Sequence, residues 1–391
     1  FICSLFVCSA VQVPSRRMRI AINTRFLQNG MEGIGYFMRE IFQRWAAQHP
    51  EHEFIFIFDR PYDPQFITSK NIIPVIAGPP ARHPVLWKWW FDVKIPAVLR
   101  KYKADVFVSA DGHCSLRTRV PQCLVMHDLA FLHYPSFHPR TQYLYYKRYT
   151  PKFIAKAKVV ATVSEFSKKD IIDQYRTAAE KIQVIYSAAK SIFHPADAAT
   201  PDAVKEKYTE GKEYFIYTGA IHPRKNLFNL LKAFSEFKKK QKSNWKLVIA
   251  GRLAWKSKSF AESINTYKYR NDVVMTGYVP DEELVRLTGA AYAMVYPSLW
   301  EGFGVPVMEA MRCEVPVITS IHSSMQEIAG DAALYADPES FHDLGEKMML
   351  LYKDESLRAR LVTKGKGVES KYTWERSAGL LWQCVERAIE Q

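Results

Sequence analysis

The sequence lacks the features that mark several common classes of protein. Its six cysteines stand at positions 3, 8, 114, 123, 313 and 384, so no pair has metal-finger spacing and no dense disulfide framework is present. A Cys114–Cys123 bridge is conceivable, but isolated buried thiols in a reducing compartment are the simpler interpretation. There is no low-complexity tract and no short repeat. The opening apolar stretch, FICSLFVCSAVQV, has 13 residues, whereas a helix that spans a bilayer needs about 20.

The first residues also lack an initiating methionine and a basic segment ahead of the apolar stretch, so they resemble a signal peptide poorly. MRIAINTRF begins at Met18, and a strand-like run follows at once. We therefore expect residues 1–17 to be a non-native or disordered extension.

Acidic residues are scarce relative to basic ones. Lysine and arginine number 54 against 40 aspartates and glutamates, which gives a formal net charge of +14. The segment 138–158 holds six basic residues and no acidic one, and the segment 82–103 is basic and rich in tryptophan. This excess favours an anionic partner, whether nucleic acid, a membrane surface or a phosphorylated substrate, although a basic soluble surface explains the charge equally well.

Short apolar runs alternate with amphipathic stretches through both halves of the chain. The runs begin at residues 19, 53, 104, 122 and 158, and again at 214, 245, 272, 291, 315 and 332. They are nearly continuous in β-branched and apolar residues, as buried parallel strands are. Helical patterns, such as those over 35–48 and 167–175, lie between them. This alternation predicts an α/β protein with doubly wound sheets.

The length of 391 residues suits two domains better than one core. Periodicity is lost over 187–204, where alanine, proline and serine gather as in a linker. We expect one Rossmann-like domain over 18–195, a second over 196–371 and an amphipathic helix over 372–391. Two such sheets would face each other across a cleft, with ligands beyond the carboxyl ends of the strands.

The segment LWEGFGVPVMEAM, residues 299–311, carries two glutamates around a glycine-containing turn. A buried strand is expected before it, and Pro306 suits the first position of a helix after it. The amides of residues 302–305 at that helix N-terminus would favour an anion or sugar hydroxyls. Glu301 would lie at the mouth of the turn and Glu309 about one helical turn inside, where carboxylates can accept hydrogen bonds from paired hydroxyls. A turn cap and a surface glutamate are the plain alternative.

A second segment, YTGAIHPRKNLFNLL at 217–231, supplies positive charge. The expected strand ends at Gly219, and the loop then presents Arg224 and Lys225 before a helix that Asn226 could cap. Adjacent cations at a strand end suit a diphosphate, although a solvated basic loop is the alternative. No acidic cluster typical of a metal site accompanies them. We therefore expect no metal and no other cofactor.

Together these segments resemble the retaining glycosyltransferases of family 4, which have the GT-B fold. The pair of glutamates separated by seven residues is the signature of that family. Further matching segments are VSEFSKKDI (163–171), TGYVPDEEL (276–284), VPVITS (315–320), SSMQEIAGDAALYADP (323–338) and YTWERSA (372–378). The resemblance covers most of residues 18–391. It implies an acceptor-side N-terminal domain, a nucleotide-sugar-binding C-terminal domain and a last helix that crosses back to the first domain.

The resemblance also implies roles for individual residues. Arg224 and Lys225 would hold the donor diphosphate and stabilise the leaving group, Glu309 would bind the ribose hydroxyls, and Glu301 the hydroxyls of the sugar ring. The other donor-binding residues would be Gly33, Gly35, Gly219, Tyr278, Val279, Gly302, Phe303, Gly304 and Val305, with the backbone near Tyr278 and Val279 beside the base.

Two N-terminal segments add to the expected site. MEGIGYF (31–37) resembles the glycine loop of the family, although a tight turn is a fair alternative for Gly33 and Gly35. VMHDLAFLHYP (125–135) ends a strand with His127, which in the family reaches the transferred sugar. A core histidine is one alternative, and a phosphohydrolase metal pair is another that lacks the further ligands it needs. The expected catalytic residues are therefore His127, Glu301, Arg224 and Lys225.

We predict a retaining hexosyltransferase that moves a sugar from a nucleotide sugar onto a glycan or lipid-linked saccharide in cell-surface polysaccharide synthesis. The HDL segment resembles bacterial polysaccharide mannosyltransferases, which favours mannose from GDP-mannose. The alternatives are a UDP- or ADP-sugar transferase of this fold, a glycogen-synthase-like or sucrose-type enzyme, and a sugar phosphorylase. A nucleic-acid-binding protein is more remote, because the basic residues follow no recognised reading element. A dinucleotide oxidoreductase would need a G-x-G-x-x-G after a strand, which is missing.

No second carboxylate is placed to attack the sugar as in retaining hydrolases, so front-face attack on an ion-pair-like transition state fits better. Basic residues beside Trp87, Trp89, Trp90 and Tyr145 would suit an anionic membrane or a lipid-diphosphate acceptor, with core tryptophans and solvated charges as the alternative. The expected location is the cytoplasm, with peripheral contact at the inner face of the cell membrane.

Overall fold

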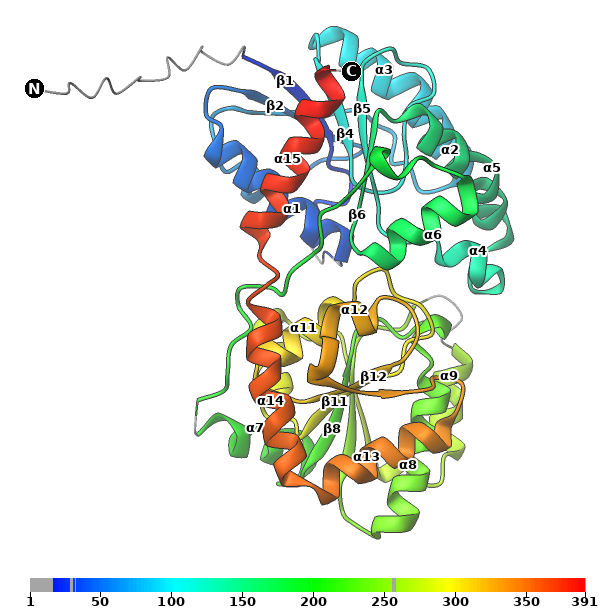
Figure 1. Cartoon of the computed structure of the whole chain (residues 1–391), viewed down its shortest axis with the longest axis vertical. Helices are drawn as coiled ribbons and strands as arrows, with labels where there is room; N and C mark the ends of the chain where they lie inside the picture. Colours follow the sequence, from blue (N-terminus) through cyan, green and yellow to red (C-terminus); the bar gives the residue numbers. More distant parts are fainter. Residues whose placement is uncertain (1–16, 29–30, 32, 198, 255–257, 391) are drawn as a thin grey trace, which may run out of the picture.

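The computed structural model describes residues 17–28, 31, 33–197, 199–254 and 258–390. Two parallel sheets, each between layers of helices, follow one another along the long axis of the molecule (Figure 1). The expected extension at residues 1–17 lies outside the described residues except for Arg17, whose guanidinium forms a 2.7 Å ion pair with Glu53.

The first sheet has seven parallel strands in the order β3-β2-β1-β4-β5-β6-β7. They are β1 (Arg19–Asn23), β2 (Glu53–Phe58), β3 (Ile72–Ile76), β4 (Val106–Ser109), β5 (Gln122–Met126), β6 (Val159–Thr162) and β7 (Ile182–Val184). Successive side chains enter opposite helical layers, so Ile20 and Ile22 belong to one buried cluster and Ala21 to the other. Burial on both faces explains why the strands are continuously apolar.

The second sheet has six parallel strands in the order β10-β9-β8-β11-β12-β13. They are β8 (Tyr214–Thr218), β9 (Lys246–Ala250), β10 (Val273–Gly277), β11 (Ala293–Tyr296), β12 (Val317–Ser320) and β13 (Ala333–Ala336). In each sheet the order reverses once, between β1 and β4 and between β8 and β11. The prediction of two doubly wound sheets is confirmed.

Helices cover both faces of each sheet. Those of the first half are α1 (Gly33–Gln48), α2 (Pro84–Trp89), α3 (Ile95–Lys101), α4 (Ala130–His133), α5 (Arg140–Lys156) and α6 (Glu165–Tyr175), with a π-helical turn, η2 (Trp90–Lys94), between α2 and α3. Those of the second half are α7 (Thr200–Thr209), α8 (Leu227–Gln241), α9 (Lys258–Thr266), α10 (Asp281–Gly289), α11 (Val305–Arg312), α12 (Met325–Ala329), α13 (Phe341–Lys353), α14 (Glu355–Glu369) and α15 (Trp374–Glu390). Across the described ranges, no helix combines the length and apolar character that a bilayer crossing requires.

Helix α15 reaches back from the second half and packs on α1 of the first half (Figure 1). Trp45 Nε1 donates a 2.9 Å hydrogen bond to the carbonyl of Ala378. The ring of Trp382 stacks on His49 with a 3.7 Å distance between centroids. The amphipathic pattern of residues 374–390 therefore buries its apolar side against α1 and against strands β4, β5, β6 and β7 of the first sheet.

The structure differs from the sequence prediction in a few elements. The sequence signals neither β3 nor β7, because β3 contains Pro74 at the edge of the sheet and β7 has only 3 residues. The expected linker over 187–204 is shorter, since α7 already begins at Thr200.

The aromatic residues expected at a membrane surface are mostly core residues. Trp87, Trp90 and Tyr145 are buried, and only Trp89 is exposed, at 36%. The indole nitrogens of Trp87 and Trp90 donate to the carbonyls of Ala81 and Ala77 at 2.7 and 2.6 Å. The core alternative is therefore correct for three of the four. Cys114, Cys123, Cys313 and Cys384 are free and buried, as expected of thiols without disulfide bridges, and Cys123 and Cys384 form a hydrogen bond with each other.

Leu381 of α15 is fully buried, so its replacement tests the packing of this helix. Leu381→Ala should lower the free energy of unfolding by about 2–5 kcal/mol, because apolar contacts are lost and a cavity is left. Gln383→Ala, at an exposed position of the same helix, should change it by less than about 0.5 kcal/mol. Urea unfolding measures the free energy of unfolding of both variants. If Leu381→Ala lowered it as little as Gln383→Ala, α15 would not fold cooperatively with the first half.

Candidate active site

Several of the residues with expected roles, namely Gly219, Arg224, Lys225 and the segment 301–305, follow the carboxyl ends of β8 and β11, which pair side by side. These strands flank the point at which the strand order of the second sheet reverses, and open α/β sheets bind ligands at such points. Gly219 follows β8, and the loop after it carries Arg224 and Lys225 on a single 3-10 turn, η5 (Pro223–Lys225). The segment 299–304 follows β11 and leads into α11.

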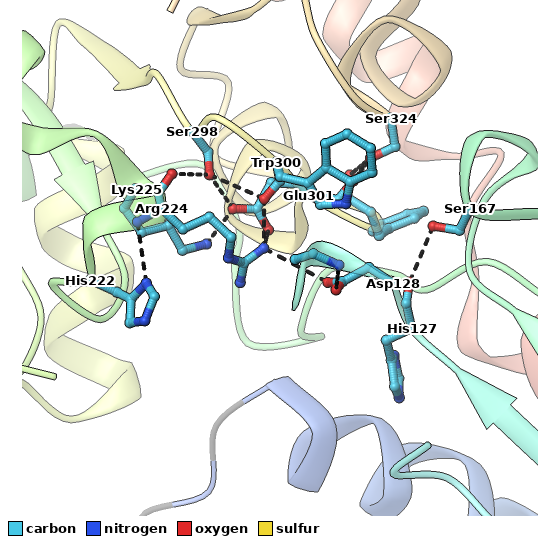
Figure 2. Close-up of polar contacts among 12 residues, drawn as sticks. His127, Asp128, Ser167, His222, Arg224, Lys225, Ser298, Trp300, Glu301 and Ser324 are labelled. Atoms are coloured by element: carbon cyan, nitrogen blue, oxygen red, sulfur yellow. Dashed lines mark hydrogen bonds and ion pairs between the residues drawn. The ribbon is translucent and has the colours of Figure 1, made fainter. Parts of the chain in front are cut away.

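Glu301 lies against both cations (Figure 2). Its Oε1 is 2.5 Å from Lys225 Nζ, and its Oε2 is 3.3 Å from Arg224 Nη1. Ser298 Oγ and Tyr296 Oη also donate to Oε1, at 2.5 and 3.2 Å. Glu301 is only 7% exposed, and its buried ion pairs join the loop after β8 to the segment after β11.

The charges in this cluster fix each other's protonation. Burial alone would raise the pKa of Glu301, but the positive charges of Arg224 and Lys225 outweigh it and lower the pKa to about 2. Burial lowers the pKa of Lys225, and the charge of Glu301 opposes that effect. Cations held in a fixed, poorly hydrated position can act on a phosphate without first reorganising water around it.

The turn between Glu301 and α11 is shaped by two glycines. A β-carbon on Gly302 would lie 2.2 Å from the carbonyl oxygen of His127, so this residue lets the second half touch the first. Gly304 has φ +97° and precedes the first residue of α11. Ser324 Oγ donates to the carbonyls of Glu301 and Phe303 at 3.0 and 3.2 Å and thereby fixes the turn.

Amide groups of this turn are free to bind a ligand. The N–H groups of Gly302, Phe303 and Gly304 donate no hydrogen bond to any other residue that the structure describes. Val305 begins α11, so its N–H has no acceptor within the helix. Such N–H groups at a helix N-terminus attract anions and hydroxyl oxygens.

Glu309 presents the second carboxylate of the motif. It is 4% exposed, and its Oε1 has no hydrogen-bond partner among the described residues. Burial raises the pKa of Glu309 to about 7; the charge of Lys190 opposes this rise and that of Asp281 adds to it. A buried carboxylate oxygen without a partner is costly, so this position calls for a ligand that donates hydrogen bonds.

Tyr278 and Val279 follow β10 and precede α10. The side chain of Tyr278 is 66% exposed, whereas Val279 is half-buried and packs against the core. Asp281, two residues further, acts electrostatically on Glu309 and forms a 2.6 Å ion pair with Lys190. The segment 278–279 thus stands two residues before a charge that acts on Glu309.

His127 follows β5 and points toward α1 rather than toward Glu301 (Figure 2). Its Nε2 lies 3.0 Å from the carbonyl of Ala110, and its ring meets Phe37 edge-on at 5.1 Å. Burial lowers the pKa of His127, so the neutral ring donates through Nε2. The hydrogen bond of the ring to the described residues is made through Nε2, which leaves Nδ1 to accept one from a ligand.

Gly33 and Gly35 occupy the first turn of α1. A β-carbon on Gly35 would lie 2.5 Å from the carbonyl oxygen of Phe26, so this glycine serves the tight turn between β1 and α1. A β-carbon on Gly33 would meet nothing within 4 Å, which leaves its backbone open to a ligand.

Three residues without a predicted role also form the site. Asp128 Oδ2 lies 3.8 Å from Arg224 Nη1. The ring of Trp300 stacks on the ring of His133 with a 3.8 Å distance between centroids. Glu327 accepts hydrogen bonds from the N–H groups of Glu165 and Phe166, at 2.8 and 2.9 Å, across the two halves of the chain. Asp128 and Trp300 are sequence neighbours of predicted residues, but the partner of Glu327 is 162 positions away and left no local signal.

The metal-site alternative gains no support near His127. Among the described residues, the group with metal-ligand spacing is His49, Glu51 and His52, which lies beside Trp382 of α15. His52 Nδ1 there already accepts a 3.3 Å hydrogen bond from the backbone of Met18.

Two family models match the chain, one on each half. The model of Glycosyltransferase Family 4 matches residues 31–189, and that of Glycosyl transferases group 1 matches residues 200–368. O-antigen chain mannosyltransferase B of Escherichia coli is 32% identical over 279 residues, which cover 71% of this chain and 73% of that protein. O-antigen chain mannosyltransferase RfbU of Salmonella typhimurium is 30% identical over 278 residues, 70% and 72% of the two chains.

Solved structures agree with this fold. Sucrose-phosphate synthase from Thermosynechococcus elongatus superposes with a TM-score of 0.79 at 18% identity and covers 96% of this chain and 100% of that chain. WaaG, a glycosyltransferase involved in lipopolysaccharide biosynthesis, gives a TM-score of 0.72 at 14% identity over 95% and 98% of the two chains. The predicted fold class is confirmed, and the protein is a GT-B glycosyltransferase that belongs to glycosyltransferase family 4.

Proposed function

We propose that this glycosyltransferase moves mannose from GDP-mannose, with retention of the anomeric configuration, onto a glycan or lipid-linked saccharide during cell-surface polysaccharide synthesis. The observation that carries the proposal is the buried ion pairing of Glu301 with Arg224 and Lys225 at the carboxyl ends of β8 and β11, together with the buried, unpartnered carboxylate oxygen of Glu309 in the helix that follows. The names of the two mannosyltransferase relatives support the choice of sugar.

A nucleoside diphosphate sugar has three parts that need different partners. The diphosphate would lie on Arg224, Lys225 and the free amides of the turn after Glu301. The ribose hydroxyls would donate to the unpartnered oxygen of Glu309, and the base would lie along 278–279. The sugar would then reach the turn of Glu301 and the free Nδ1 of His127.

Transfer would proceed at one face of the anomeric carbon. The bond to the diphosphate oxygen breaks, and Arg224 and Lys225 stabilise the charge that collects on the leaving phosphate. The acceptor hydroxyl attacks from the side that the phosphate leaves and gives its proton to a phosphate oxygen. This path uses no carboxylate nucleophile. Glu301 is not free to act as one, because both of its oxygens are engaged by protein donors. The path needs no metal ion, because the two cations act on the leaving group.

The donor is tested by thermal unfolding with GDP, UDP, ADP and their sugar conjugates, without added metal. A ligand that binds only the folded chain raises its stability according to concentration over Kd. GDP and GDP-mannose should raise the melting temperature and the others should not. A shift with UDP or ADP alone would assign a different donor, and no shift with any nucleotide would refute the donor site.

Lys225 should be needed for turnover rather than for folding. Lys225→Ala removes a cation from the leaving group and should lower kcat about 100- to 1,000-fold. Lys232→Ala, at an exposed lysine of α8, should leave kcat within twofold of the original. Release of nucleoside diphosphate measures both. Near-normal turnover of Lys225→Ala with an unchanged melting temperature would contradict the assignment.

Nucleotide binding should depend on pH through Glu309. Its pKa of about 7 lies above the usual value of a glutamate, so the carboxylate that accepts ribose hydroxyls is scarce below the pKa and abundant above it. Affinity for GDP should thus fall roughly tenfold from about pH 8 to about pH 6. Glu309→Gln should remove that part of the dependence, and calorimetric titration of both proteins gives the difference. An identical pH profile for the two would show that Glu309 does not meet the nucleotide.

A further inference from the structure

A buried ion pair lies at the carboxyl end of the first sheet. Arg25 follows β1 and Asp111 follows β4, the two strands between which the strand order of this sheet reverses. Arg25 Nε is 2.5 Å from Asp111 Oδ2, and the two side chains are 5% and 0% exposed. Burying two charges costs desolvation that their mutual attraction often fails to offset, so stability alone explains this pair poorly.

Both carboxylate oxygens of Asp111 are engaged. Oδ2 also accepts a 2.8 Å hydrogen bond from Asn23 Nδ2, and Oδ1 accepts one of 3.1 Å from Ser109 Oγ. The ring of His113 donates through Nδ1 to the backbone carbonyl of Asp111 at 2.8 Å, because a carbonyl oxygen can only accept. Burial alone would raise the pKa of Asp111, but the charge of Arg25 and hydrogen bonds such as that from Asn23 hold it well below its usual range. The carboxylate is therefore charged, and the backbone at residue 111 is held from several sides.

Aromatic rings enclose the guanidinium of Arg25. Its central carbon lies 4.9, 5.8 and 5.4 Å from the ring centroids of Phe26, Trp87 and Phe91. Such rings attract a cation and restrict its orientation without neutralising it. The direction of the Arg25 Nε–H is thereby fixed, and with it the position of Asp111.

Asp111 adjoins the residue that holds His127. The carbonyl of Ala110, one position earlier, lies 3.0 Å from His127 Nε2, and the strands that precede these two residues, β4 and β5, are neighbours in the sheet. Since the carbonyl only accepts, Nε2 must carry a proton. Burial lowers the pKa of His127, so the ring is neutral and its lone pair stands on Nδ1.

We propose that Asp111 and Arg25 are positioning residues that set the tautomer of His127. Their ion pair fixes the peptide of Ala110, whose carbonyl keeps the proton on Nε2 and leaves Nδ1 to accept a hydrogen bond from a hydroxyl of the transferred sugar. In the other tautomer the lone pair of Nε2 would face the carbonyl oxygen, and Nδ1 could no longer accept. The role in transfer rests on the proposed function, in which the sugar reaches Nδ1.

Heteronuclear NMR of protein with nitrogen-labelled histidines tests the tautomer directly. The signals of His127 are identified by their loss in His127→Asn. In the original chain they should show a protonated Nε2 and an unprotonated Nδ1. The opposite pattern, or averaged shifts for the two nitrogens, would overturn the proposal.

Variants of the ion pair should disturb this tautomer. Asp111→Asn leaves the charge of Arg25 without its carboxylate, so the turn at Ala110 should relax and the two His127 nitrogens should move toward averaged shifts. Because a buried unpaired charge can also unfold the chain, the same spectrum is recorded for Arg25→Met combined with Asp111→Asn. This double variant holds no charge at the pair and places an apolar side chain among the aromatic rings, so it should fold and still lose the single tautomer.

Asp59→Asn is the matched control. Asp59 follows β2, is fully buried and pairs with Arg60 at 2.7 Å, so the change removes the same kind of charge from the same half of the chain. The signals of His127 should stay unchanged in this variant. A tautomer that survives in both variants of Asp111, or that is lost equally in Asp59→Asn, would overturn the proposal.

Kinetics test the consequence for transfer. Asp111→Asn should lower kcat about 10- to 100-fold, because one oriented hydrogen bond to the sugar is lost. Affinity for GDP, which carries no sugar, should stay within about twofold. Combined with His127→Asn, Asp111→Asn should lower kcat no further, and additive losses would show that Asp111 does not act through His127. The NMR result does not depend on the donor, so a chain that fails to bind GDP refutes the proposed function and not the assignment of the tautomer.

Discussion

The ion pairs of Glu301 with Arg224 and Lys225 are the interaction on which the site depends. They join the loop after β8 to the turn after β11, at the point where the strand order of the second sheet reverses. Without Glu301, Lys225 would lie buried without a paired carboxylate and Arg224 would keep only Asp128, whose Oδ2 is 3.8 Å from its Nη1. Without the cations, a buried carboxylate would favour its protonated form. The turn that Glu301 begins also carries N–H groups that donate to no other residue in the described part of the chain.

Contact between the two halves follows from this arrangement. The turn that Glu301 begins presses Gly302 against the carbonyl of His127, and Trp300 stacks on His133 beside it. Arg224 faces Asp128 across the same junction. The segment 299–304 thus supplies the carboxylate that pairs with both cations, the free amides of the turn and the contact with the first half.

Much of the fold was predictable because buried parallel strands leave a strong apolar signal. The segments around β1, β2, β5, β8 and β9 are continuously apolar, whereas the edge strand β3 carries Pro74 and escapes detection. Glu301, Glu309, Arg224 and Lys225 were predictable as candidate site residues because they stand in two short motifs. Contacts such as Glu327 with α6, and the burial of Trp87 and Trp90, depend on tertiary packing between distant segments, which local pattern does not encode.

The position of Glu327 has a consequence for motion. Its carboxylate supplies acceptors to the first two N–H groups of α6, a task that a helix usually assigns to its own N-terminal residues. Ser164 caps a later N–H of the same helix, from the same half of the chain. Any separation of the two sheets would therefore break the two hydrogen bonds that Glu327 accepts from the first turn of α6. The hydrogen bond that Ser164 accepts would remain, because Ser164 belongs to the same half of the chain as α6. The hydrogen bonding of the backbone amides of Glu165 and Phe166 therefore reports whether the two halves are in contact.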